Sequence, residues 1–322
     1  MPRILFVKTS SLGDVVHNCP AVSDVARQVP GAIIDWVVEE PFDEVAALHG
    51  AVRRVIPVAI RRWRGELLEP ATWTGFAQFR AALRAETYDS VIDSQGLVKS
   101  ALVSMLARGR RHGFDRASAR EPFAARFYEQ THAVDAGLHA VERNRRLAAQ
   151  ALGYRLEGGC DYGLRVSGEA PMRARSPYAL LLTMTSREDK LWPEEHWRAL
   201  GGALEARGIH CLLPWGTEEE RRRCARIATA IPGAVVPRRM AIAELARLAA
   251  GAHCVVGVDT GLAHLSAAFG VAVVGIYVGS DPALTGLYGA ARVRSLGGVG
   301  RPPVVRDVLD ALEDIAAPEA AR

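Results

Sequence analysis

Short apolar runs rich in β-branched residues alternate along this chain with stretches of helical periodicity, and this alternation restricts its possible folds more than any other feature. In the first half, strands are expected over 3–7, 33–38, 54–58 and 89–93, and helices after the SSLGD loop as far as Val29 and over 76–85, 97–107 and 138–152. Strands separated by helices form βαβ units, in which a parallel sheet carries helices on both faces. The pattern predicts a doubly wound α/β domain.

The same alternation restarts after residue 177. Expected strands cover 178–183, 210–215, 253–258 and 271–278, and expected helices cover 193–206, 218–230, 241–249, 261–269 and about 304–315. Between the halves, 153–177 is interrupted by Gly, Pro and mixed charge, which is typical of a linker. We therefore predict two doubly wound Rossmann-like domains, 1–160 and 161–322, facing a central cleft, with the last helix a candidate for packing back on the first domain.

Composition places the chain among soluble globular proteins. Of its 322 residues, 49% are hydrophobic and 24% charged, which excludes disorder as the main state. Basic and acidic residues number 21 and 18 up to residue 160 and 19 and 18 after it, so neither half is basic enough for general nucleic-acid binding. No apolar run is long enough to span a bilayer, and the N-terminus lacks signal-peptide features, so a cytoplasmic location is expected.

Cysteines and lysines are both informative through their positions. The five cysteines are scattered and never spaced as CxxC, which argues against a disulfide framework and a structural zinc site. Among 40 basic residues the only lysines are Lys8, Lys99 and Lys190, and all three fall at expected strand ends. Two readings stay open: accidental survivors of a coding bias toward Arg, or lysines kept for function.

The loop KTSSLGD after the first strand contains Asp14, at the start of the next helix. An acidic residue there either caps the helix and interacts with its dipole or serves as a general base. A helix terminus would lower the pKa of Asp14 and so weaken it as a base unless its surroundings desolvate it. Both roles stay open.

In the second half, a buried strand leads into Asp259, Thr260 and Gly261, and a helix begins at once. Free backbone N–H groups at such a helix start suit a pyrophosphate. His264 lies one turn further on, either as a functional residue or as a satisfied core histidine. Capping of the helix alone would account for Asp259 and Thr260 but not for His264.

Two further loops carry groups suited to a nucleotide. Thr185, Ser186 and Lys190 follow a strand and offer hydroxyls and a compact positive charge. The segment PWGTEEERRR places three glutamates at a helix start, one of which could bind ribose hydroxyls while the others favour the helix dipole. The GxGxxG, GxxxxGK[ST], HExxH and GxSxG motifs are all absent, which removes the main support for dinucleotide-dependent, P-loop, zincin and α/β-hydrolase chemistry.

The segments VKTSSLGDVVH, DWVVEE, VIPVAIRRWR, DSQGLVKSA, AREP, HAVER, DKLWPEEHWR, LPWG and VDTGLAHL resemble, in collinear order, the lipopolysaccharide heptosyltransferases of glycosyltransferase family 9. VAIRRWR and AREP favour the type I members. The resemblance implies a GT-B fold and inverting, metal-independent transfer of L-glycero-D-manno-heptose from ADP-heptose to the first Kdo of Kdo2-lipid A. It implies no cofactor, since ADP-heptose is a substrate.

The resemblance also assigns residues by position. Asp14 matches the catalytic base, and Lys190 matches a residue that supports catalysis at the donor phosphates. The donor site matches Thr185, Ser186, Lys190, Glu220, Met240, Asp259, Thr260, Gly261 and His264, although the three consecutive glutamates leave the register of Glu220 open. The basic acceptor surface matches Arg61, Arg62, Arg64, Lys99, Arg120 and Arg143. Ser186 stands where the family often has Thr, and Gly65 where it has Lys, which thins one acceptor contact.

Alternatives remain at three levels. The chain has two arginine clusters, and each by itself is more typical of a solvated face than of an anion-binding site: Arg53, Arg54, Arg61, Arg62 and Arg64, and then Arg108, Arg110, Arg111, Arg116 and Arg120. The activity could be that of a type II heptosyltransferase or another GT-B sugar-nucleotide transferase, and a non-catalytic nucleotide-sugar-binding module could use the same loops. The expected location is the cytoplasmic surface of the inner membrane, with peripheral attachment through charge and no insertion helix.

Overall fold

The computed structural model describes residues 1–172, 177–185 and 187–316, and these form two compact units, Met1–Arg165 and Val166–Arg322. We call them the first and the second domain. The division falls inside the segment 153–177 that the sequence marks as a linker. In the described part of the chain, no helix is both long and apolar enough to cross a membrane.

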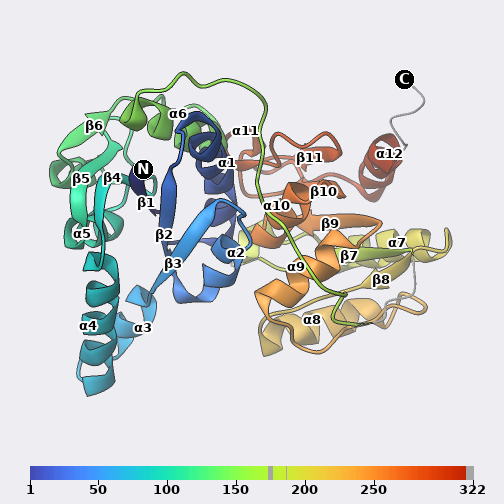
Figure 1. The fold of residues 1–322 in the computed structure, drawn as a ribbon. Coiled ribbons are helices and arrows are strands. Elements are labelled where there is room, and N and C mark those ends of the chain that lie inside the picture. Colours follow the sequence, from blue (N-terminus) through green and yellow to red (C-terminus); the bar gives the residue numbers. More distant parts are fainter. Residues whose placement is uncertain (173–176, 186, 317–322) are drawn as a thin grey trace. The chain divides into compact units, whose positions relative to one another are not determined.

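The first domain is built on a six-stranded sheet in the order β3-β2-β1-β4-β5-β6, with every neighbouring pair parallel (Figure 1). Its strands are β1 (Arg3–Val7), β2 (Ile33–Glu39), β3 (Val52–Val58), β4 (Thr87–Asp93), β5 (Arg108–Phe114) and β6 (Gln130–His132). The central strand β1 is almost fully buried because helices cover both faces of the sheet. Parallel sheets of this kind read as continuous apolar runs, which explains the RILFV signal.

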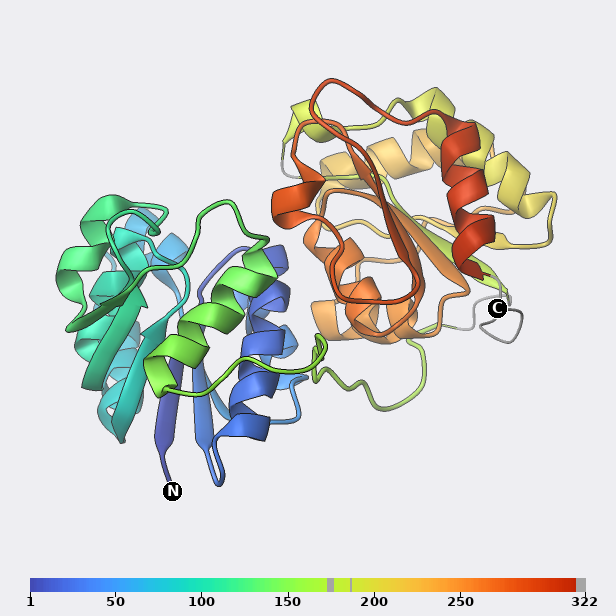
Figure 2. The ribbon, with the colours of Figure 1, turned by 90° about the horizontal axis from the view of Figure 1, so that it is seen from above.

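Helices of the first domain divide between the two faces of this sheet. They are α1 (Leu12–Gln28), α2 (Asp43–Ala47), α3 (Ile60–Gly65), α4 (Pro70–Arg84), α5 (Val98–Leu106) and α6 (Ala140–Leu152), with short 3-10 turns η1 (Glu40–Phe42) and η2 (Pro122–Phe127). Figure 2 shows α1 and α6 side by side on one face. On the other, Phe79 and Leu83 of α4 and Val103 of α5 pack against Leu5 and Val91 of the sheet.

The second domain repeats this plan with a five-stranded parallel sheet in the order β11-β10-β9-β7-β8. Its strands are β7 (Tyr178–Leu182), β8 (His210–Leu212), β9 (Cys254–Val258), β10 (Ala272–Tyr277) and β11 (Val293–Gly297). Its helices are α7 (Glu194–Glu205), α8 (Glu218–Ala228), α9 (Ile242–Ala250), α10 (Gly261–Ala268), α11 (Pro282–Thr285) and α12 (Val305–Ala316), with η3 (Glu188–Lys190). The predicted pair of doubly wound domains is confirmed.

Two cores cover opposite faces of this second sheet. One contains the aromatic residues Trp192 and Trp197, and the other contains Leu248 of α9 and Ala263 of α10. The helix α12 buries Val308, Ala311, Leu312 and Ile315 in the first of these cores. The apolar face of α12 is therefore part of the second domain's own core.

Three strands and three short helices escaped the sequence pattern, the helices being α2, α3 and α11. The strand β5 has the sequence RGRRHGF, whose charges we interpreted as an arginine cluster, and β6 has only three residues. The strand β11 lies at a sheet edge, where less of its surface is buried. The helix α3 contains Arg61, Arg62 and Arg64 and has no buried residue of its own.

Candidate functional site

Asp14 in the first domain is both a helix cap and one half of an ion pair. It occupies the third position of α1, where Oδ2 accepts the backbone N–H of Ser11 at 3.0 Å. The guanidinium of Arg120 grips the same carboxylate, with Nη2 donating to Oδ1 at 2.7 Å and Nη1 to Oδ2 at 3.2 Å. Both carboxylate oxygens are thus engaged by an arginine that lies far away in the sequence.

Burial by itself would raise the pKa of Asp14, but the positive charges of Lys8 and Arg120 outweigh it and hold that pKa well below its ordinary value. Lys8 directly follows β1 and is only 2% exposed. Its Nζ donates to the carbonyl of Ser94 at 2.8 Å and to Oδ1 of Asn144 at 3.4 Å. Burial lowers the pKa of Lys8 to about 8. The carboxylate therefore stays ionised beside a buried ammonium.

Other predicted basic residues gather around this loop. Nζ of Lys99, at the start of α5, donates to Oγ of Ser10 at 3.3 Å. Arg143, in the first turn of α6, lies over the ring of Phe114 at 4.9 Å and donates to the carbonyl of Ser118. Burial and the neighbouring charge of Arg120 lower the pKa of Arg143. Lys99, Arg120 and Arg143 thus follow three different strands and converge near Asp14, because carboxyl ends of parallel strands share one edge of a sheet.

The three arginines of α3 form a separate group at the end of β3. Arg61 donates its backbone N–H to Oε1 of Glu39 at 2.8 Å and places its guanidinium 5.5 Å from the centre of the Phe42 ring. Arg62 pairs with Glu40 at 2.9 Å on the surface, and Arg64 is exposed. The structure therefore brings only part of the predicted acceptor set to Asp14 by direct contact.

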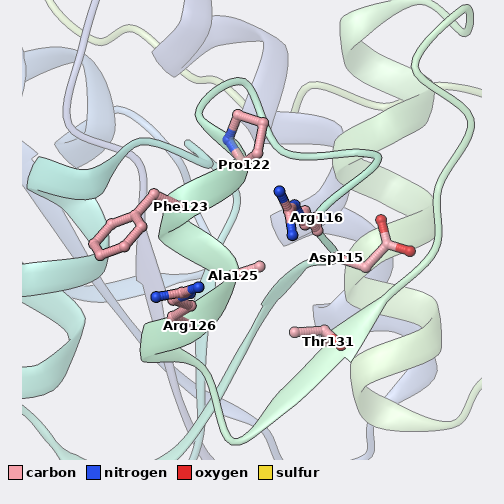
Figure 3. A pocket seen from close by; sticks show the side chains of 7 residues that line it. All are labelled: Asp115, Arg116, Pro122, Phe123, Ala125, Arg126 and Thr131. Carbon is pink, nitrogen blue, oxygen red and sulfur yellow. The ribbon is translucent and has the colours of Figure 1, made fainter.

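A cavity of about 680 Å³ adjoins the loop that bears Arg120 and was not predicted (Figure 3). It is lined by Asp115, Arg116, Pro122, Phe123, Ala125, Arg126 and Thr131. The guanidinium of Arg126 lies 5.1 Å from the centre of the Phe123 ring. Six of its lining residues lie in the connection between β5 and β6, and Thr131 belongs to β6, in a part of the chain where the sequence predicted no helix or strand.

In the second domain, Asp259 follows the buried strand β9 and accepts bonds from two partners. Nζ of Lys190 and Oγ of Ser280 both donate to its Oδ2 at 2.6 Å. Nε2 of the buried His264 lies 3.6 Å from Oδ1. Burial opposes ionisation, but the neighbouring His264, Lys190 and Ser280 together hold the pKa of Asp259 well below its ordinary value.

The structure also places the other residues predicted for this site. His264 is buried, as a core histidine would be, and it also contacts the carboxylate of Asp259. Thr260 precedes α10, which begins at Gly261, and Oγ1 of Thr185 donates to the carbonyl of Asp259 at 3.0 Å. Ser186 lies outside the described residues. Ser280 was missed; its only signal was its position just after the apolar run VAVVGIYV.

A cavity of about 240 Å³ lies beside this centre and is lined by Met240, Thr260, Leu262, Glu220 and Trp215, among others. Of the three consecutive glutamates, Glu220 is the one that lines it. Its Oε2 accepts the backbone N–H groups of Gly216 at 2.6 Å and Thr217 at 3.1 Å.

The other two glutamates of that run point elsewhere. Glu218 pairs with Arg221 at 2.7 Å, on the exposed side of α8. Glu219 lines a second cavity of about 630 Å³ that also includes Thr185, Glu220 and Arg223. In the described part of the chain, no group of three or more His, Cys, Asp or Glu side chains is placed to hold a metal ion.

A family model described as glycosyltransferase family 9 (heptosyltransferase) matches residues 76–304. The chain belongs to this family. It is 47% identical to lipopolysaccharide heptosyltransferase 1 of Escherichia coli K12 over 291 residues, which cover 89% of this chain and 91% of that protein. It is also 47% identical to the enzyme of the same name from Pseudomonas aeruginosa, over 90% of this chain and 82% of the relative.

Solved structures give the same answer. E. coli heptosyltransferase WaaC with ADP matches with a TM-score of 0.90 and 43% identity, over 98% of this chain and 100% of that one. The same enzyme with ADP-2-deoxy-2-fluoro heptose matches with a TM-score of 0.86. E. coli heptosyltransferase II matches with a TM-score of 0.77 at 20% identity, which speaks for the fold alone. The predicted fold class, that of the GT-B family 9 glycosyltransferases, is confirmed.

Proposed function

We propose that this glycosyltransferase moves L-glycero-D-manno-heptose from ADP-heptose to the first Kdo of Kdo2-lipid A, with inversion and without a metal, in assembly of the lipopolysaccharide inner core. The observation that carries the proposal is the carboxylate of Asp14 paired with Arg120, in a chain similar to lipopolysaccharide heptosyltransferase 1 over most of its length. The solved relative that binds ADP and a fluorinated ADP-heptose supports the choice of donor.

In this reaction Asp14 acts as general base. The acceptor hydroxyl oxygen forms a bond to the anomeric carbon of heptose while the bond from that carbon to the diphosphate oxygen breaks. The hydroxyl proton passes to the carboxylate of Asp14, and ADP leaves with the electron pair. Attack from the face opposite ADP inverts the anomeric centre.

The second domain holds the donor and receives the charge of the leaving group. Lys190 and the N–H groups at the start of α10 supply positive charge where the diphosphate develops negative charge. Thr185 and Ser186 add hydroxyls, and the diphosphate competes with Asp259 for Lys190. Met240 lines the adenine cavity and Glu220 accepts the ribose hydroxyls. Thr260, Gly261 and His264 surround the sugar-proximal phosphate.

The first domain holds the acceptor through charge. Kdo carries a carboxylate and lipid A carries phosphates, so Lys99, Arg143 and the arginines of α3 have anionic partners. Arg120 has a double role, because it occupies both oxygens of Asp14 in this structure. An acceptor carboxylate draws Arg120 away, which frees Asp14 and raises its pKa toward that of a competent base.

The test is release of ADP from ADP-heptose in the presence and absence of Kdo2-lipid A. The proposal predicts acceptor-dependent ADP release and a product heavier by one heptose. A type II activity would instead require an acceptor that already bears heptose. A binding module would take up ADP-heptose and release no ADP with either acceptor. Peripheral attachment at the cytoplasmic face of the inner membrane would place the enzyme beside its lipid acceptor.

A further inference from the structure

The turn between α3 and α4 in the first domain, together with the first residues of α4, exposes large apolar side chains. Leu67 is 57% exposed, Leu68 97% and Trp73 61%, within a span of seven residues. Figure 1 shows α3 and α4 beside one another at the lower end of this domain. Scattered exposed apolar residues are normal in soluble proteins, but a cluster at the tip of one helical hairpin points to a partner. We call Leu67, Leu68 and Trp73 the apolar tip.

The apolar tip is displayed by packed structure. The ring of Trp63 in α3 packs edge-on against Phe76 at 5.7 Å and against Phe79 at 5.8 Å, both in α4. Phe79 belongs to the core beneath the sheet, so the hairpin is anchored. Nε1 of Trp73 donates to the carbonyl of Leu67 at 3.0 Å, which ties the indole to the turn. Its exposure is therefore a property of the fold.

Positive charge lies on the same hairpin. Three arginines lie in α3, shortly before the apolar tip: Arg61, Arg62 and Arg64. Two acidic residues, Glu66 and Glu69, flank the leucines. Arg62 forms an ion pair with Glu40. A tryptophan and leucines beside arginines is the combination that favours the boundary between headgroups and acyl chains of an anionic bilayer.

We infer that the apolar tip inserts into the surface of an anionic lipid bilayer, with the α3 arginines at the lipid phosphates. The inference rests on the proposed function in one respect, since a glycolipid acceptor gives the enzyme a reason to dock there. It revises the expectation of purely electrostatic attachment. Insertion adds an apolar contribution that salt does not screen.

The test is co-sedimentation of the full chain with vesicles of phosphatidylethanolamine and phosphatidylglycerol at low and high salt. Replacing Leu67 and Leu68 together by Ser lowers the partition coefficient roughly tenfold or more at both salt concentrations, as expected from the apolar area withdrawn from lipid. The matched control is Val299→Ser, because Val299 is 69% exposed in the second domain. Equal partitioning of the double variant and the parent would overturn the inference.

Fluorescence gives a second readout. Lipids brominated near the headgroup quench the emission of the parent protein, and Trp73→Phe removes most of that quenching. Unchanged quenching in Trp73→Phe would contradict insertion at this site. A tip that instead joins two copies of the chain would show as a dimer in sedimentation velocity that the double Ser variant dissociates, with no change in vesicle binding.

Kinetics separate this inference from the proposed function. The double Ser variant keeps the parent rate with a water-soluble deacylated acceptor and loses rate with an acceptor embedded in vesicles. If the parent releases no ADP with either acceptor, the proposed function fails, while vesicle partitioning still decides on the tip. Equal rates of the variant and the parent on embedded acceptor would count against the tip.

Discussion

Asp14 in the first domain and Asp259 in the second are similar carboxylates in opposite surroundings. Each follows a buried parallel strand and stands at a helix start, and each has a pKa held below its ordinary value, by the charges of Lys8 and Arg120 at Asp14 and by hydrogen-bonding neighbours at Asp259. Asp14 is gripped by Arg120, which is itself partly exposed. Asp259 is held by Lys190, Ser280 and the buried His264.

The two carboxylates differ in which of their partners a ligand can displace. An anionic acceptor can take Arg120 and leave Asp14 free, with Lys8 still buried beneath it. Around Asp259, a diphosphate can take Lys190, while Ser280 and His264 still hold the carboxylate. The same strand-end geometry thus suits a base in one domain and a structural anchor for the donor in the other.

Among substitutions of the groups that surround the two carboxylates, the largest effect is expected for Lys190→Met. Loss of the ammonium leaves the departing diphosphate without its main cation, so kcat/KM for ADP-heptose falls roughly 10²- to 10³-fold. Lys190→Arg restores part of this loss. The matched control is Arg187→Gln, because Arg187 is exposed and pairs locally with Asp189. A loss of acceptor affinity with unchanged donor kinetics would contradict the assignment.

A somewhat smaller effect is expected for Arg120→Met. Its kcat/KM for the natural acceptor falls about 10²-fold, the size of a lost charge-assisted bond pair, while ADP binding by calorimetry stays unchanged. The parent discriminates strongly against an acceptor whose Kdo carboxylates are methyl esters, and the variant does not. Arg116→Met, in the same loop, serves as control. If Arg120→Met and the parent discriminate equally against the methyl-ester acceptor, Arg120 does not move from Asp14 to the acceptor carboxylate.

Glu220→Gln tests the ribose contact with a milder change. Gln still closes the capping box with Thr217, so α8 is preserved, but the charge-assisted bond to the ribose is lost. The KM for ADP-heptose rises roughly tenfold with kcat little changed. Glu219→Gln provides the comparison, since Glu219 does not line the 240 Å³ cavity that Met240 and Glu220 line. If Glu219→Gln has the larger effect, the ribose contact is misassigned.

The smallest effect concerns pH and stability. His49 is buried, and burial lowers its pKa to about 4. Its Nδ1 accepts the N–H of Ala51, so protonation costs that bond. Between pH 6.5 and about 4, His49 is protonated in the unfolded chain but neutral in the folded chain. The free energy of unfolding therefore falls by roughly 1–3 kcal/mol as pH drops through this range.

This pH window separates the histidine from the two carboxylates. Asp14 and Asp259 have lowered pKa values, so the stability they contribute is lost only as pH falls below the ordinary aspartate range. Urea unfolding of the parent and of His49→Gln at pH 7 and pH 5 measures the difference. A parent that loses no more stability than the variant between these pH values would contradict the account of His49.

Much of the fold was predictable because buried parallel strands are apolar throughout and their helices are amphipathic. The strand β5 was not, since RGRRHGF is only partly buried and its pairing with β4 depends on the whole sheet. The site divides in the same way. Asp14 and Asp259 could be predicted because each follows an apolar strand in the sequence. The ion pair of Asp14 with Arg120 could not, since it joins residues 106 positions apart and depends on the order of the strands in the sheet.

The central claim is that the first domain supplies the base and the second holds the donor, and Asp14→Asn tests it most directly. Asn keeps the size of the side chain and an oxygen for the N–H of Ser11, so α1 remains capped. ADP release with Kdo2-lipid A should fall about 10²- to 10⁴-fold while the affinity for ADP is unchanged. A variant that turns over at the parent rate, or that loses ADP binding together with activity, would contradict the claim.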